Sequence, residues 1–428
     1  MRRRWLWLGG LLVLVGGGAA LATQGYAGYH LRAGRAALEH YHTAEARRHL
    51  DACLRVWSAN ETAHVLAARA ARRAGDFDAA ERHLQACARP DGKQSPDVVL
   101  EWALLTAVKG DLLEVEEFLR ARAQKDPSIA PLVWEALAEG NTRMYRALGA
   151  LEMLDHWLAA DPDNPRAHYL RGNVHRQGNA SKAIPDYRRA VELDPDNDEA
   201  RWWLAVVLQK GGQFHEALPH LEQLRGRGWP DPDLRVRIAH SLDKVGRTPE
   251  ARQLLDAVLA DNPEAGFALR VRGQLELAAG DLPEAEKRLR EAARVLPNDY
   301  EVHYSLAQCL REENNKEAAA EVQAVAEKLK ARSERLGDLR AREMPIKPHD
   351  PAVHCEMGVL LDALGHTDLA EKWLYSSLHE DPDYLPAHAA LADFYQRHQR
   401  DAGKVEEHRR LARGAKAPDP DARAVKKP

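Results

Sequence analysis

The sequence predicts an all-α protein assembled from a repeated pair of short helices. The pattern is clearest over Gly266–Asp299, where Leu269, Gly273 and Leu277 recur at steps of four and so share one helical face. Gly280 then interrupts the helix, and a second amphipathic run follows. The composition agrees, because aromatic residues make up only 6% of the chain and no stretch alternates as a strand would.

The spacing of prolines gives the length of the repeated unit. Pro263 and Pro297 are 34 residues apart, and each follows a second helix that a proline cannot continue without a clash one turn back. A helix–turn–helix unit of this length, with a small residue at the helix crossing and a closing proline, resembles the tetratricopeptide repeat. The resemblance implies a right-handed α-solenoid, a superhelix whose concave groove is lined mostly by the first helix of each repeat.

Units of this kind recur along nearly the whole chain, and we predict about ten to eleven of them. In order, they are Ala27–Asn60, Glu61–Gly92, Pro96–Ile129, Ala130–Asn164, Pro165–Asn197, Asp198–Asp231, Pro232–Ala265, Gly266–Asp299, a ninth from Tyr300, Pro351–Tyr384 and an eleventh from Leu385. One helix pair cannot bury both of its apolar sides, so neighbouring repeats must stack.

The ninth repeat departs from the pattern because it has no closing proline and helix-favouring residues continue beyond it. We therefore predict a second helix that protrudes from the stack, followed by a loop over Met344–Asp350. The predicted organisation is residues 1–26 as an N-terminal segment, 27–333 as repeats one to nine, 334–350 as an insertion, 351–413 as repeats ten and eleven, and 414–428 as a disordered tail.

The N-terminal segment predicts export. Three arginines follow Met1, and Trp5–Ala22 is an uncharged run of 18 residues, near the lower limit for spanning a ~30 Å hydrocarbon core. As a membrane anchor it would hold the repeats outside the cytoplasm, because the arginines stay inside. As a signal peptide it would be cleaved after Ala22, within a small-residue pattern, and the protein would be secreted.

Composition and motifs argue against several classes of function. Lys+Arg 61 against Asp+Glu 65 is nearly balanced, so we expect no general binding to nucleic acid. His215 and His220 miss the HExxH spacing of metalloproteases, and we predict no metal, no cofactor and no catalytic residue. Cys53 and Cys87 occupy equivalent slots about 10 Å apart in stacked repeats, beyond the ~7 Å reach of a disulfide, so we predict packing roles without disulfides.

The resemblance also implies which side chains face the concave groove. The predicted partner-binding residues are Arg35, Arg69, Arg72, Arg166, Tyr169, Asn173, Arg176, Trp202, Arg270, Tyr304 and Arg311. Arginine and aromatic residues are enriched at binding hot spots. The alternative is an ordinary solvated helix face on which arginine stems cover alanines.

The sequence thus predicts a non-catalytic scaffold of the cell envelope that binds protein or peptide partners of acidic character in its groove. The alternative is a non-catalytic subunit that targets an envelope enzyme or delivers its substrate. An enzyme would need an acid–base or metal constellation that the sequence does not show.

Overall fold

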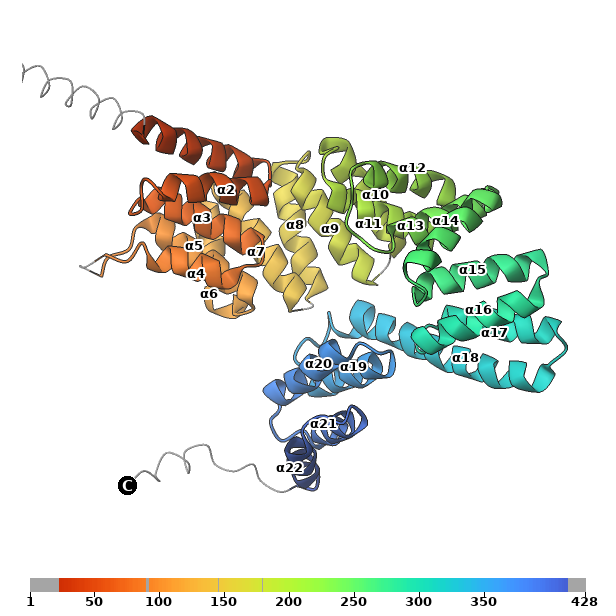
Figure 1. The fold of residues 1–428 in the computed structure, drawn as a ribbon. Coiled ribbons are helices and arrows are strands. Elements are labelled where there is room, and N and C mark those ends of the chain that lie inside the picture. The colour runs from red at the N-terminus through yellow and green to blue at the C-terminus, as the bar shows by residue number, and fades with distance from the viewer. Residues whose placement is uncertain (1–22, 90–91, 145, 179, 415–428) are drawn as a thin grey trace, which may run out of the picture. The chain divides into compact units, whose positions relative to one another are not determined.

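The computed structural model describes residues 23–89, 92–144, 146–178 and 180–414, and every helix of these residues belongs to a series of consecutive pairs (Figure 1). No strand occurs within these ranges, which confirms the all-α prediction. The chain divides into two compact units. Unit 1 takes in residues 1–144 and 148–170, and unit 2 takes in residues 145–147 and 171–428.

The helices of each unit follow the predicted repeats. Unit 1 contains a helix over residues 23–39, α2 (Thr43–Leu54), α3 (Glu61–Arg73), α4 (Phe77–Gln85), α5 (Pro96–Lys109), α6 (Leu112–Lys125), α7 (Ala130–Arg143) and α8 (Ala147–Ala160). Helix α9 (Pro165–Gly178) begins in unit 1 and ends in unit 2. Unit 2 continues with α10 (Ala180–Leu193), α11 (Asp198–Lys210), α12 (Phe214–Gly226), α13 (Leu234–Lys244), α14 (Thr248–Asp261), α15 (Gly266–Ala279), α16 (Leu282–Val295), α17 (Tyr300–Glu312), α18 (Lys316–Asp338), the π-helix η1 (Leu339–Glu343), α19 (Pro351–Ala363), α20 (Thr367–Glu380), α21 (Leu385–Arg397) and α22 (Ala402–Ala412).

The turn inside each repeat follows from its glycine and the residue after it. Gly280 ends α15 with a φ of 81°, a left-handed conformation that glycine adopts without a steric penalty. Asp281 then caps α16, because its side chain accepts a hydrogen bond from the Glu284 backbone N–H at 3.4 Å. Gly75 and Asp76 do the same between α3 and α4, where Asp76 accepts from the Ala79 N–H at 3.1 Å.

The small residue at the helix crossing lies where the sequence predicts it. A methyl group placed on Gly273 would lie 2.8 Å from Leu289 Cγ of the paired helix, and one on Gly358 would lie 2.7 Å from Leu374 Cγ. A methyl group placed on Gly172 would lie 2.8 Å from the Tyr187 ring of the paired helix. These contacts are closer than side-chain packing permits, so the predicted role of Gly172, Gly273 and Gly358 is confirmed.

Neighbouring repeats share one apolar core, as the stacking argument requires. A continuous cluster of buried residues runs from α11 to α15 and takes one or more side chains from every helix in between. Trp202, Leu221, Ile238, Leu255 and Val271 represent the five helices in order, and each is at most 6% exposed. The core of one repeat is therefore completed by the next repeat.

The prediction of a protruding helix after the ninth repeat is wrong. Helix α18 does extend to Asp338 and continues as η1, but Leu336, Leu339 and Met344 are buried in one apolar cluster with side chains of α19, α20 and α21. Arg335 adds an ion pair with Glu356 of α19 at 2.6 Å. The insertion over residues 334–350 is therefore packed along much of its length, because its apolar residues complete the core of the tenth repeat. Residues 344–350 form turns.

A recurring histidine joins consecutive repeats, a role that the sequence analysis did not predict. His168, His303, His354 and His388 each place Nε2 2.9–3.0 Å from the carbonyl oxygen of the proline six residues earlier. Because a carbonyl only accepts, Nε2 carries the proton in each ring. Each histidine thereby ties the start of a first helix to the proline turn that closes the preceding repeat.

His388 of this set and another first-helix histidine, His64, each meet a second histidine on the partner helix. The Nδ1 atoms of His388 and His408 are 3.0 Å apart, and those of His64 and His83 are 3.1 Å apart. His64 also reaches the Ser58 carbonyl through Nε2 at 2.9 Å, so its Nδ1 must accept from His83. Burial and the neighbouring histidine lower the pKa of both His83 and His408.

We predict that stability falls as the pH drops below about 6.5, the pKa of an unfolded histidine. Below that pH, His83 and His408 bind protons more readily in the unfolded chain than in the folded one, which favours unfolding. The free energy of unfolding then falls by up to about 1.4 kcal/mol for each unit by which folding lowers a histidine pKa. Thermal unfolding at pH 7.5 and pH 5.5 measures the effect, which His83→Asn and His408→Asn should reduce. The exposed His215→Asn is the control, and an equal acid loss in all variants would contradict the prediction.

Candidate functional site

The predicted groove residues all lie on first helices of repeats. Arg35 lies on the helix over residues 23–39, Arg69 and Arg72 on α3, Arg166, Tyr169, Asn173 and Arg176 on α9, Trp202 on α11, Arg270 on α15, and Tyr304 and Arg311 on α17. Their surroundings differ, however, and separate them into buried ion pairs, a groove in unit 1, and exposed or stacked positions in unit 2.

Glu101 of α5 gathers two of the predicted arginines in unit 1. Its carboxylate accepts from Arg69 Nε at 3.0 Å and from Arg72 Nε at 2.9 Å. The Arg72 and Glu101 side chains are 0% and 1% exposed, and that of Arg69 is 18% exposed. Burial alone would raise the pKa of Glu101, but the two guanidinium groups lower it, so the carboxylate stays ionised.

Glu135 of α7 forms a second buried cluster with arginines of two other first helices. Arg73 Nη2 donates to Glu135 at 2.6 Å, and Arg166 Nη2 pairs with Glu139, one turn along α7, at 2.8 Å. Arg73 also donates to the Leu38 carbonyl at 2.7 Å. The arginines lower the pKa of Glu135 against the effect of burial. First helices from four repeats are thus joined by one layer of ion pairs.

The structure corrects three of the predicted contact residues. Arg72 is 1% exposed, Tyr169 5% and Trp202 6%, so these side chains cannot offer an open surface to a partner. Arg72 is held inside by Glu101, and Tyr169 lies under the Arg166 guanidinium at 5.4 Å from ring centroid to Cζ. Their roles are structural, because a buried arginine with a buried carboxylate completes the core between helices.

An open groove of about 470 Å³ lies over this layer in unit 1. Its walls come from first helices of four consecutive repeats and mix apolar and charged side chains. They include Arg35, Leu38, Tyr41, Thr62, Val65, Arg69, Arg73, Asp97, Leu100, Ile129 and Leu132. The structure therefore brings the predicted Arg35 and Arg69 together at one site. Burial raises the pKa of Tyr41 to about 12, so its hydroxyl stays protonated.

In unit 2, several of the predicted residues are already engaged. Arg270 pairs with Asp299 at 3.1 Å and with Glu301. Asn173 accepts from the Tyr187 hydroxyl at 2.7 Å. Arg311 is exposed and donates to Gln323 at 3.3 Å, and the Tyr304 ring makes an edge contact with Tyr300. These residues are not brought together at one site.

Arg176 is different because an aromatic ring, and not a carboxylate, holds it. Its guanidinium lies 3.8 Å from the Trp203 ring centroid. Arg237 on α13 is placed in the same way between Trp202 at 5.3 Å and Phe267 at 5.4 Å. Sequence reasoning missed Trp203 and Arg237, although they follow the predicted Tyr169 at steps of 34 residues, one repeat each. The repeat spacing was therefore the signal that could have found them.

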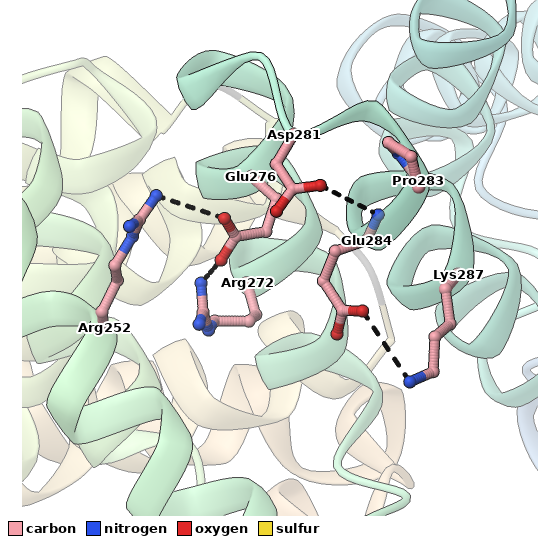
Figure 2. A pocket seen from close by; sticks show the side chains of 7 residues that line it. All are labelled: Arg252, Arg272, Glu276, Asp281, Pro283, Glu284 and Lys287. Atoms are coloured by element: carbon pink, nitrogen blue, oxygen red, sulfur yellow. Dashed lines mark hydrogen bonds and ion pairs between the residues drawn. The ribbon is translucent and has the colours of Figure 1, made fainter.

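Figure 2 shows a further depression of unit 2, where α14, α15 and α16 meet. Arg252 and Arg272 both reach Glu276, and Arg252 Nη2 lies 3.2 Å from its carboxylate. Lys287 pairs with Glu284 at 3.8 Å. The positive charge of this depression is therefore neutralised from within.

The described residues contain neither a disulfide nor a cluster of side chains that could hold a metal ion. Cys53, Cys87, Cys309 and Cys355 are buried and free, and burial raises the pKa of each thiol, to about 11 for Cys309 and Cys355. Within the ranges the structure describes, no three His, Cys, Asp or Glu side chains are grouped to hold a metal ion. The same ranges contain no helix that is long and apolar enough to cross a membrane.

Family models match four stretches of the chain. A TPR repeat model matches residues 175–212, and a tetratricopeptide repeat model matches residues 31–95, 236–287 and 270–334. The chain therefore contains tetratricopeptide repeats, and the predicted all-α solenoid of such repeats is confirmed.

Two curated proteins are similar over about half of this chain. "Cellulose synthase 2 operon protein C" of Komagataeibacter xylinus is 26% identical over 294 residues, which cover 55% of this chain and 21% of that protein. A TPR repeat-containing protein of Pseudomonas aeruginosa is 27% identical over 230 residues, covering 51% of this chain and 34% of that protein. The chain thus spans a minor part of the length of both relatives.

Two solved structures match parts of this chain. YrrB, described as a TPR protein with an unusual peptide-binding site, is 21% identical with a TM-score of 0.38, over 43% of this chain and 95% of that chain. PilW, described as a type IV pilus biogenesis factor, is 19% identical with a TM-score of 0.38, over 45% of this chain and 90% of that chain.

We predict that Glu101→Gln destabilises unit 1 by about 3–5 kcal/mol, because it leaves the buried charge of Arg72 without a counterion. Urea unfolding followed by circular dichroism measures the loss. The control is Glu116→Gln in the more exposed pair with Arg120 of α6, which should cost less than about 1 kcal/mol. Equal midpoints for the two variants would show that the buried pairs do not hold the first helices together.

Proposed function

We propose that this chain of tetratricopeptide repeats is a protein-interaction scaffold that holds segments of partner proteins against its first helices and catalyses no reaction. The groove of unit 1 carries the proposal. Arg35 and Thr62 lie on its exposed rim, and Leu100 and Leu132 supply apolar lining. Repeat proteins use such extended surfaces, formed by several repeats together, to bind other proteins.

The size and lining of the groove suit a peptide. A space of about 470 Å³ accommodates a few side chains of an extended segment, whose successive side chains point to opposite sides. Leu100 and Leu132 offer apolar contacts, while Arg35, Arg69 and Asp97 offer polar ones. Such a mixture fixes both the affinity and the orientation of a bound segment.

The carboxylates beneath the groove support a non-catalytic role. Glu101 and Glu135 are ionised and enclosed by arginines, and their pKa values are lowered. A general acid needs a proton to donate near neutral pH, and a general base needs access to its substrate. Neither glutamate meets these needs, because each is at most 1% exposed.

We propose a cell-envelope location, with the repeats outside the cytoplasm. The proposal rests on the sequence of residues 5–22, which lie outside the described residues. A single-pass anchor would hold the scaffold at the membrane, whereas cleavage after Ala22 would release it as a secreted protein.

A second candidate is a non-catalytic subunit that targets an envelope enzyme or delivers its substrate. The similarity to a protein named for a cellulose synthase operon favours it, since 55% of this chain is matched. An enzyme that co-purifies in a fixed ratio with this chain would support the subunit role. A varied set of partners without an enzyme would support the general scaffold.

We predict that filling the unit 1 groove reduces partner capture about tenfold or more. The variant is Arg35→Glu/Thr62→Trp, which reverses one charge and places an indole at an exposed position. Full-length chain is purified from solubilised membranes and its partners are quantified. Arg48→Glu, an exposed position on second helix α2, is the matched control. Equal partner capture by both variants and the wild type would contradict the proposal that partners bind in the groove.

We predict that the chain fractionates with membranes after carbonate extraction and keeps its N-terminus. An apolar segment of 18 residues that spans the bilayer resists extraction, because its transfer to water is unfavourable. Carbonate extraction with immunoblotting and N-terminal sequencing measures both. Recovery in the soluble fraction with Thr23 as the first residue would show a cleaved signal peptide instead.

A further inference from the structure

Unit 2 carries three basic side chains on consecutive first helices, which we call the cation trio: Arg176 of α9, Lys210 of α11 and Arg237 of α13. Four first-helix arginines of unit 1 lie against carboxylates at 2.6–3.0 Å, namely Arg69, Arg72, Arg73 and Arg166. By contrast, no carboxylate of the described residues lies within 4 Å of any member of the trio. No direct ion pair therefore cancels the positive charge of these three side chains.

Arg176 is fixed without a counterion. Its guanidinium lies 3.8 Å from the Trp203 ring centroid, and its Nε donates to the Tyr187 hydroxyl at 3.1 Å. Tyr187 in turn donates to Asn173 at 2.7 Å. Stacking on an aromatic face orients the planar guanidinium while its terminal nitrogens keep their donor capacity.

Arg237 is fixed in the same manner. Its Cζ lies 5.3 Å from the Trp202 ring and 5.4 Å from the Phe267 ring, and Nη1 donates to Gln209 Oε1 at 3.1 Å. Gln209 is itself held, because its Nε2 donates to the Arg237 carbonyl and to Ser241 Oγ, both at 2.8 Å. The polar partners of Arg237 are thus neutral, and its charge is preserved.

The surroundings confirm an excess of positive charge. Loss of solvation and the charges of Arg176 and Arg237 lower the pKa of Lys210. Burial, with Lys244 and Arg270, lowers the pKa of His240 to about 4, so that ring is neutral at pH 7. Nearby carboxylates offset part of the charge, but Glu301 is paired with Arg270, and burial raises the pKa of Asp233.

We propose that the cation trio binds an extended acidic segment of a protein partner, with one carboxylate opposite each member. The proposal rests on the scaffold function above and assigns it a ligand class. Guanidinium groups match carboxylates in shape, and ion pairs formed in this way are stronger than neutral hydrogen bonds. Trp203 and Phe267 are only partly buried, so they add apolar contact beside the charges.

The helix spacing sets the expected pattern of the ligand. Packed helices lie about 8–10 Å apart. An extended chain in the polyproline II conformation rises about 3.1 Å per residue and has three residues per turn, so every third side chain returns to the same face. A carboxylate at about every third residue therefore matches one cation per first helix. The acidic segment that fits best has glutamates at positions i, i+3 and i+6.

The test uses the full-length chain and a fluorescein-labelled peptide with three glutamates at that spacing, followed by fluorescence anisotropy. A second peptide replaces the glutamates with glutamines. We expect the glutamine peptide to bind at least tenfold more weakly, and Arg176→Gln and Arg237→Gln each to weaken the glutamate peptide about tenfold. Added salt should weaken binding further, because exposed charges are screened.

Arg235→Gln is the matched control, because Arg235 lies on the same helix as Arg237 but pairs with Asp261 of α14 at 2.8 Å. Its affinity for the glutamate peptide should equal that of the wild type, and circular dichroism checks that all variants fold. Equal binding of the two peptides, or an equal loss in Arg235→Gln, would overturn the proposal. Tighter binding of a labelled oligothymidylate, lost in the same variants, would overturn it in favour of nucleic acid.

A partner-capture experiment separates this proposal from the scaffold function itself. Wild type and Arg176→Gln/Lys210→Gln/Arg237→Gln are compared as bait from solubilised membranes. Reduced capture of specific partners by the triple variant supports the trio. If the wild type recovers specific partners and the triple variant recovers the same set, the scaffold stands and the trio is wrong. If the wild type recovers none while the peptide results hold, the scaffold is wrong and the trio stands.

Discussion

The buried ion pairs between first helices are the constraint on which the organisation of unit 1 depends. Arg72 and Glu101 are almost completely removed from water, and neither charge is tolerable there without the other. Arg73 and Glu135 impose the same condition between α3 and α7. Because each pair joins different repeats, a shift of one first helix against the next would expose an unpaired buried charge. The pairs therefore fix the alignment of the helices that form the groove.

Unit 2 places arginines on the same kind of helix but holds them differently. Arg176 and Arg237 lie against aromatic rings, and their hydrogen-bond partners are a hydroxyl and an amide. An aromatic ring orients a guanidinium without cancelling its charge, whereas a carboxylate cancels it. The first helices of unit 1 and unit 2 both carry arginines and aromatic residues, but the arginines held by aromatic rings in unit 2 keep a charge that can attract an anionic group. Function on a repeat scaffold is decided by such local arrangements and not by the fold.

The repeats could be predicted from the sequence because the residues that define each repeat lie close together in the chain. The crossing glycines, the turn and the closing proline act within one 34-residue unit, so Gly273 and Pro297 could be assigned without a structure. The ion pairs could not, since Glu101 is 29 residues from Arg72 and Glu135 is 62 residues from Arg73. Which first-helix arginine is buried depends on acidic residues of other repeats.

Dependence on residues of other repeats also explains the wrong prediction for the end of the ninth repeat. Helical propensity correctly extended α18, but propensity does not say whether a helix is covered. Leu336 and Leu339 belong to the buried apolar cluster of α19, α20 and α21, which the missing proline alone did not indicate. The role of Arg237 was missed for the same reason, because the rings that hold its guanidinium, Trp202 and Phe267, belong to the first helices before and after its own.

The close packing of first helices links the repeat to its binding surface. Gly140 lets α7 approach α5 so closely that a methyl group there would lie 2.4 Å from the Ala107 carbonyl. Small residues at such contacts keep the helices near the lower limit of helix spacing. That spacing sets the distance between side chains on consecutive first helices, and therefore between their charges. If a partner segment binds as proposed, it meets these side chains at intervals that the helix packing imposes. The residues that build the solenoid would then also define the pattern that its surface recognises.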